Sequence, residues 1–181
     1  MFEQSTELPE PMAYHCSAQI NKTHLIIAGN IYPPHTQAYV VDTNSAPFKF
    51  TKLPVMLKQR WGCACAVIRT NNKFSEYSSE EDILLLVAGG EFPNYVSTEF
   101  YSFLNNNWKD GPLLPRGFYY GGYTQNIDDF ILMGGWDGSS YRSDLLRYNQ
   151  ADQKFEFLEG NLITGRGRFG AINVDREDFC T

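Results

Sequence analysis

Three landmarks return in the same order along this chain, and this internal repeat restricts its fold more than any other feature. An apolar run ends in glycine at Gly29, at Gly89-Gly90 and at Gly134-Gly135. About a dozen residues later comes Val41, Tyr101 or Tyr148, and seven residues after each of these comes an aromatic side chain, at Phe48, Trp108 and Phe155. The same spacing, found three times, indicates one structural unit present in three copies.

The segments inside each unit predict short β-strands joined by turns. They are rich in β-branched and aromatic residues and are bounded by glycine, proline, asparagine and aspartate. No stretch has apolar residues at helical spacing over three turns. The period is 45 residues from Gly90 to Gly135 and 60 residues from Gly29 to Gly89, and the excess corresponds to a polar insertion at about 70–82. Four short strands in each repeat are typical of propeller blades.

The chain resembles the Kelch repeat family over most of its length. The resemblance is carried by the glycines and by the Tyr and Trp positions that follow them: Gly29, Gly89, Gly90, Tyr101, Trp108, Gly134, Gly135, Tyr148 and Phe155. It implies an all-β propeller with about three four-stranded antiparallel blades in an incomplete ring. The blades are expected at about 12–53, 58–113 and 116–160, with the first strand of a further blade at about 166–175.

Three blades and a fraction do not make a ring, because propellers close with about four to eight blades. Two explanations remain open. The chain is either part of a longer propeller or one of two copies that assemble into a six-bladed ring. The general rule that repeats need neighbours and caps favours the longer propeller.

The cysteines predict buried core positions and not a disulfide framework. The chain has four, at Cys16, Cys63, Cys65 and Cys180, with no Cys-x-x-Cys spacing that would indicate a zinc site. The first residues show no basic and apolar pattern of a signal peptide, so we expect a cytoplasmic protein. One glycosylation sequon, Asn21-Lys22-Thr23, leaves a secreted binding domain as an alternative.

The expected binding residues lie on one face of the propeller, in the loops between the second and third strands and in the linkers between blades. Each loop carries two rings, and two arginines stand where linkers lead into the next unit. Tyr, Trp and Arg are typical of interface hot spots. The candidates are Tyr32, His35, Phe92, Tyr95, Trp136, Asp137, Tyr141, Arg60 and Arg116. The alternative is that some of these rings pack against neighbouring blades.

The function expected from the resemblance is the binding of another protein or a peptide, since Kelch propellers often serve as substrate-recruiting arms of ubiquitin ligases or as scaffolds. A ligase adaptor would also need BTB and BACK domains, which these 181 residues do not contain. The formal net charge of −6 and the scattered basic residues argue against nucleic acid and membrane partners.

No enzyme activity, metal or cofactor is expected. The sequence Gly165-Arg166-Gly167-Arg168-Phe169-Gly170 matches a dinucleotide-binding pattern, but the residues after it read as a strand where that motif needs a helix. The three histidines show no cluster with carboxylates. An enzyme with its site at the mouth of the central channel is the alternative function.

Overall fold

The computed structural model describes residues 7–70, 82–91, 93–126 and 129–173. Within these ranges the chain forms three four-stranded antiparallel sheets and no helix, so none of the described residues belong to a helix that could span a membrane. The first sheet contains β1 (Cys16–Asn21), β2 (His24–Ala28), β3 (Ala38–Asp42) and β4 (Lys49–Lys52). The second contains β5 (Ala64–Thr70), β6 (Asp82–Ala88), β7 (Thr98–Ser102) and β8 (Asn107–Asp110). The third contains β9 (Gly122–Gln125), β10 (Phe130–Met133), β11 (Asp144–Asn149) and β12 (Lys154–Asn161).

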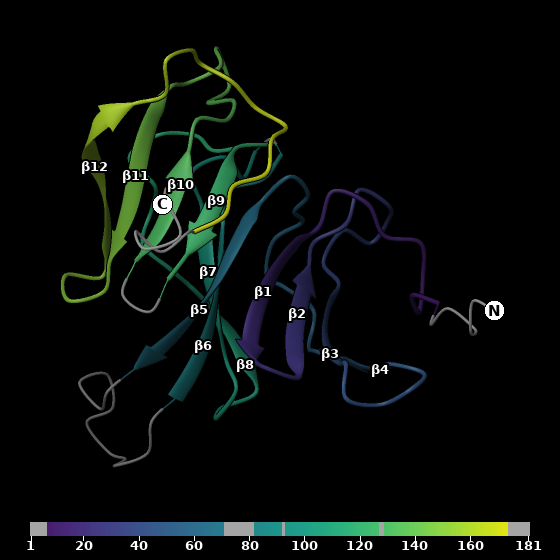
Figure 1. Ribbon diagram of the computed structural model, residues 1–181. Coiled ribbons are helices and arrows are strands. Elements are labelled where there is room, and N and C mark those ends of the chain that lie inside the picture. Colours follow the sequence, from purple (N-terminus) through teal and green to yellow (C-terminus); the bar gives the residue numbers. More distant parts are fainter. Residues whose placement is uncertain (1–6, 71–81, 92, 127–128, 174–181) are drawn as a thin grey trace, which may run out of the picture.

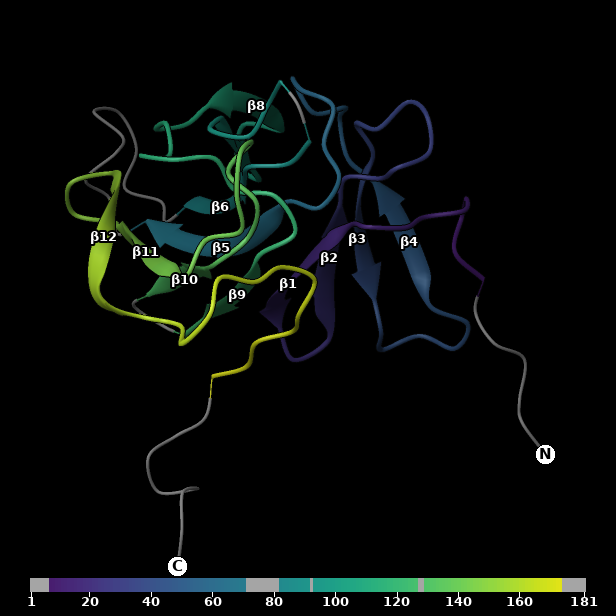
Figure 2. The same ribbon diagram turned by 90° about the horizontal axis from the view of Figure 1, so that it is seen from above.

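Each sheet keeps its strands in chain order, so its first strand is an edge strand. These first strands converge: β1 packs against β5, and β5 against β9. Seen from above, β1, β5 and β9 lie together near the middle while β4, β8 and β12 lie toward the rim (Figure 2). The arrangement is propeller-like, and the three sheets of the described residues do not close into a ring (Figure 1).

The middle sheet is buried on both faces, which explains why its inner strands are continuously apolar. Because side chains alternate along β5, Cys65 and Val67 pack against the first sheet, while Ala66 and Ile68 pack against the third. Cys63, just before β5, lies on the same side as Cys65, as their spacing predicts. Small side chains fit here because neighbouring sheets approach each other most closely at their inner strands.

The aromatic landmarks of the second and third units are cross-strand pairs. Tyr101 lies opposite Trp108, and Tyr148 lies opposite Phe155. The first pair fills the core between the first and second sheets, and the second pair fills the core between the second and third. In the first unit the prediction of Phe48 is wrong, because Val41 pairs with Phe50 and Phe48 is 45% exposed.

The linkers that join the sheets repeat the same backbone hydrogen bonds. One linker residue, Arg60 or Phe118, donates its N–H to the loop of the preceding sheet, at His35 O (2.9 Å) or Tyr95 O (2.9 Å). Its carbonyl then lies against the glycine that ends the second strand of that sheet. A Cβ atom on Gly29 would be 2.7 Å from Arg60 O, and Gly29 has a φ of +81°. The repeated glycine is therefore required by the docking of the next unit.

A second set of bonds links the units near the axis. Gly62 N donates to Tyr14 O (2.7 Å), Tyr120 N to Gly62 O (2.9 Å) and Arg168 N to Tyr120 O (2.6 Å). All four residues have left-handed backbone conformations, with φ between 56° and 63°. We call this series of residues the joint ladder. It has four positions for three sheets, so Arg168 occupies the place where a fourth unit begins.

Two strands differ from the sequence prediction. The strand expected to open at Arg116 begins only at Gly122, and before it Tyr119 forms an isolated bridge with Trp136. No strand forms over residues 166–173, although the expected range continues to 175, outside the described residues. A strand there would need a second strand of the same unit as its partner. Most of the insertion at 70–82 also lies outside the described residues.

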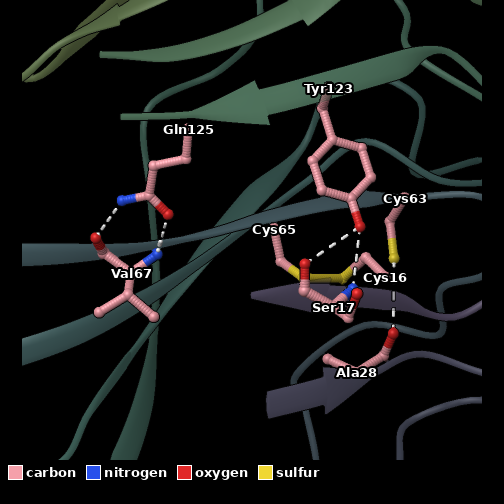
Figure 3. Close-up of a disulfide and its surroundings, with 8 residues drawn as sticks. All are labelled: Cys16, Ser17, Ala28, Cys63, Cys65, Val67, Tyr123 and Gln125. Carbon is pink, nitrogen blue, oxygen red and sulfur yellow. Dashed lines mark hydrogen bonds between the residues drawn. A yellow bond between two sulfur atoms is a disulfide. The ribbon is translucent and has the colours of Figure 1, made fainter. Parts of the chain in front are cut away.

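Cys16, Cys63 and Cys65 are buried as expected, but a disulfide that the sequence analysis did not anticipate joins the inner strands of the first two sheets. It links Cys16 of β1 to Cys65 of β5, whose Cα atoms are 5.7 Å apart (Figure 3). Cys63 is free and buried beside it, and its thiol lies 3.9 Å from Ala28 O. Cys180 lies outside the described residues. The spacing of two indicated a shared face but could not reveal a partner from another unit.

Candidate functional site

The candidate site is a group of aromatic side chains around the joint ladder, at the upper ends of the inner strands in Figure 1. We define this aromatic face by the rings nearest the ladder and by the loop rings that adjoin them. Its members are Tyr14, His35, Trp61, Tyr95, Tyr119, Tyr120, Trp136 and Tyr141. They come from all three units, so the face exists only when the sheets are docked.

Tyr119 is the centre of the aromatic face. Its ring lies 3.8 Å from the ring of Tyr120, between centroids, and its hydroxyl accepts a hydrogen bond from Trp61 Nε1 at 3.1 Å. Tyr14 meets Tyr120 edge to face at 5.0 Å. Gly62 allows this packing, since any side chain there would collide with the rings of Tyr119 and Tyr120. The glycine therefore serves both the ladder and the face.

A carboxylate and a guanidinium flank these rings. Burial raises the pKa of Tyr119, and its hydrogen bond to Glu91 raises it further. Glu91 directly follows Gly90, in the loop that connects β6 to β7. The guanidinium of Arg168 lies over the ring of Tyr120, 4.8 Å from its centroid, in a cation–π contact. The face thus combines apolar area, hydroxyl groups and both signs of charge.

Four residues predicted from the sequence belong to this face. His35 lies 4.8 Å from Trp61 between ring centroids, with its Nδ1 3.0 Å from Asn30 O. Tyr95 lies 6.2 Å from Tyr119. Trp136 meets Tyr141 edge to face at 5.2 Å. The structure therefore brings together rings from the loops of all three units.

Of the other predicted loop residues, Tyr32 and Asp137 make none of the ring contacts found among the described residues. Tyr32 is 52% exposed on the loop of the first sheet. Asp137 has a structural role, because its carboxylate accepts the backbone N–H groups of Ser139 (2.7 Å) and Ser140 (2.8 Å). Phe92 lies outside the described residues.

Both predicted arginines are withdrawn from the surface, which corrects their placement in a binding site. Arg60 is completely buried; its Nε donates to Glu99 Oε1 at 2.6 Å, and other donors reach Ser97. The side chain of Arg116 is 8% exposed and pairs with Asp144. A charged residue in a linker looks exposed in sequence. In the structure, each of these linker arginines is instead buried against the sheet that follows it in the chain, where it pairs with Glu99 or Asp144.

Sequence analysis missed Tyr14, Trp61, Tyr119, Tyr120 and Arg168. A signal was present, because an aromatic residue precedes the inner strand of every unit, at Tyr14, at Trp61 and at Tyr119-Tyr120. The inner strands expected from the sequence already included Trp61, Tyr119 and Tyr120, whereas β5 begins at Ala64 and β9 at Gly122. Tyr14, Tyr120 and Arg168 instead have a left-handed backbone conformation, which a strand does not adopt.

Apart from the aromatic face, a concavity with a volume of about 870 Å³ lies along the axis. Its walls are the inner strands, and two side chains of β9 bridge to the others (Figure 3). The Gln125 amide pairs with both the N–H and the carbonyl of Val67, and the Tyr123 hydroxyl bonds to Ser17 N (2.9 Å) and O (3.2 Å). Among the described residues no cluster of His, Cys, Asp or Glu could hold a metal ion. These polar groups satisfy the backbone at the edges of the inner strands.

Comparison with known proteins supports the fold and names no family. No protein-family model matches the chain, and no curated protein matches it. It is similar to a solved structure described as "Structure of YjhT", with a TM-score of 0.70 and 15% sequence identity. The match covers 90% of this chain and 56% of that one, so the chain spans little more than half of its neighbour's length. Such a likeness shows the fold alone.

Proposed function

We propose that the chain is part of a Kelch-type propeller that binds another protein or a peptide through the aromatic face. The observation that carries the proposal is the convergence of Tyr, Trp and His rings from three units around Tyr119. Interfaces derive most of their affinity from such rings, packed at the centre of a patch that also contains charged groups.

The exposed rings at the border of the face are the most direct test. Tyr14 is 48% exposed and Tyr141 is 50% exposed, so a partner would cover both. After a partner has been identified by crosslinking, its affinity should be measured by titration calorimetry for the wild type and for the double variant Tyr14→Ala/Tyr141→Ala. We expect binding to weaken about 30-fold or more, the loss typical of hot-spot residues.

The control is Phe157→Ala, which removes a ring of similar exposure (55%) from the middle of β12, away from these loops. It should leave the affinity unchanged. If the double variant binds as well as the wild type, the aromatic face is not the binding surface. Circular dichroism of both variants separates a lost interface from a lost fold.

The proposal includes the completion of the ring. The fourth position of the joint ladder, Arg168, supports the presence of at least one further unit. That unit and the rest of the ring are supplied by a longer chain or by a second copy of this one. The protein proposed here is not an enzyme. Its expected place was the cytoplasm, but the Cys16–Cys65 disulfide favours an oxidising compartment.

A further inference from the structure

The strongest unassigned feature is the turn that follows β1, which contains the sequon Asn21-Lys22-Thr23. Asn21 is exposed and ends the strand. Its side-chain oxygen accepts hydrogen bonds from the backbone N–H groups of Thr23 (2.9 Å) and His24 (2.9 Å) and from the hydroxyl of Thr23 (3.1 Å). The turn is therefore organised around the asparagine itself.

These bonds determine which way the amide points. The two backbone N–H groups need an acceptor, and of the two polar atoms of the Asn21 amide only Oδ1 can accept a hydrogen bond. Nδ2 must then occupy the opposite position, and none of the hydrogen bonds found among the described residues uses it. The nucleophilic atom of the sequon is directed away from the turn and is accessible.

An independent observation concerns the compartment. The strand that ends at Asn21 begins at Cys16, which is bonded to Cys65. Disulfides form and persist in the endoplasmic reticulum and outside the cell, and are rare in the cytosol. The endoplasmic reticulum also carries out asparagine-linked glycosylation at exposed sequons. β1 therefore begins at a disulfide-bonded cysteine and ends at an asparagine of a glycosylation sequon, and the endoplasmic reticulum makes both modifications.

We propose that Asn21 is a site of N-linked glycosylation and that the protein folds in the secretory pathway. The donor is a lipid-linked oligosaccharide pyrophosphate. The amide Nδ2 forms a bond to the anomeric carbon of the sugar, the bond from that carbon to the phosphate oxygen breaks, and the lipid pyrophosphate leaves. Nδ2 loses one proton to the solvent.

The position of Asn21 suits a glycan. It ends the strand that the chain enters through Tyr14, so it lies at the far end of β1 from the aromatic face (Figure 1). A bulky hydrophilic chain there leaves the proposed binding surface free. The inference departs from the cytoplasmic expectation and does not depend on the proposed function.

The first experiment uses the protein from its own cells, captured by antibody and digested without reduction. We expect the peptides of Cys16 and Cys65 to be linked, and the peptide of Asn21 to carry a glycan. Peptide N-glycosidase in heavy-oxygen water should convert Asn21 to aspartate labelled with one heavy oxygen. An unmodified Asn21, or Cys16 and Cys65 as free thiols, would overturn the proposal.

The second experiment compares matched variants of the full chain behind a cleavable leader, translated into vesicles of endoplasmic reticulum. The wild type, Lys22→Gln and Thr23→Ser retain the sequon and should each gain one glycan. Asn21→Gln and Thr23→Ala lose it and should gain none. A wild-type chain that forms the disulfide inside the vesicles yet gains no glycan would show that the turn is not an acceptor.

Discussion

Arg60 and Glu99 form an ion pair in which both side chains are fully buried. Glu99 also accepts the backbone N–H of Leu57 at 2.7 Å, so the pair fixes the whole linker onto the second sheet. A buried pair adds little compared with a well-packed apolar pair, but the loss of one partner leaves an unpaired charge. Its importance lies in how it holds the linker in place.

Replacement of Arg60 with alanine should therefore be strongly destabilising. We expect Arg60→Ala to lower the free energy of unfolding by about 3–5 kcal/mol, because Glu99 is left charged and buried. Urea unfolding followed by tryptophan fluorescence measures the change. The control is Arg142→Ala, whose ion pair with Asp144 has an arginine side chain that is 42% exposed; it should cost less than about 1 kcal/mol. Equal losses would contradict the importance of burial.

Cys63 should be protected from alkylation in the folded protein. Burial raises the pKa of its thiol to about 11, and the thiolate is the reactive form. A raised pKa stabilises the fold below the pKa of the unfolded thiol, and this contribution is lost as the pH rises through about 11. Mass spectrometry of the Cys63 peptide after iodoacetamide treatment at pH 8 should show slow labelling when folded and fast labelling in urea. Similar rates would refute its protection.

Residue identity predicted the core better than the surface. The alternation of Cys65 and Val67 with Ala66 and Ile68 follows from strand geometry, so the two faces of β5 could be assigned from sequence. The burial of Arg60 could not, because the acceptors that compensate it lie 37 and 39 residues further along the chain.

Strands and hairpins show how far repeat spacing can be used. The pairs Tyr101–Trp108 and Tyr148–Phe155 have the same spacing because β7–β8 and β11–β12 are joined by turns of similar geometry. The first unit has a longer connection between β3 and β4, so Val41 pairs with Phe50. A motif copied with a fixed offset fails where one hairpin is two residues longer.

The Cys16–Cys65 disulfide joins two sheets and should stabilise their docking. The bond closes a loop with a sequence separation of 49 residues, for which chain entropy predicts a stabilisation of about 4 kcal/mol. The double variant Cys16→Ala/Cys65→Ala should lose up to that amount in urea unfolding. A reductant should destabilise the wild type by a similar amount and leave the double variant unaffected. A wild type that resists reductant and unfolds like the variant would contradict this.

At the scale of the whole molecule, the sequence predicted three sheets because the repeat is long and regular. It could not predict whether the sheets belong to a closed ring, since repeat spacing describes one unit and its neighbour and not the number of units. Over the described residues no sheet follows the third, and two isoleucines beyond β12 are exposed, Ile163 by 100% and Ile172 by 81%. Apolar side chains at a place where a further unit would dock promote association.

We therefore expect the isolated 181-residue chain to associate. Light scattering coupled to size-exclusion chromatography should give a mass of at least twice the 20.7 kDa of one chain, with the far-ultraviolet spectrum of a β protein. Ile163→Glu should shift the population toward the monomer. A folded, stable monomer of the wild type would show that three sheets suffice.

The joint ladder is made only of backbone atoms, with a left-handed residue at each step. Gly62 must lack a side chain because of Tyr119 and Tyr120, but tyrosine and arginine occupy the other positions, since the bonds themselves use no side-chain atom. A substitution at Tyr14, Tyr120 or Arg168 that keeps the left-handed backbone keeps these hydrogen bonds. The loops above the ladder can therefore change in sequence while the frame beneath them keeps its geometry.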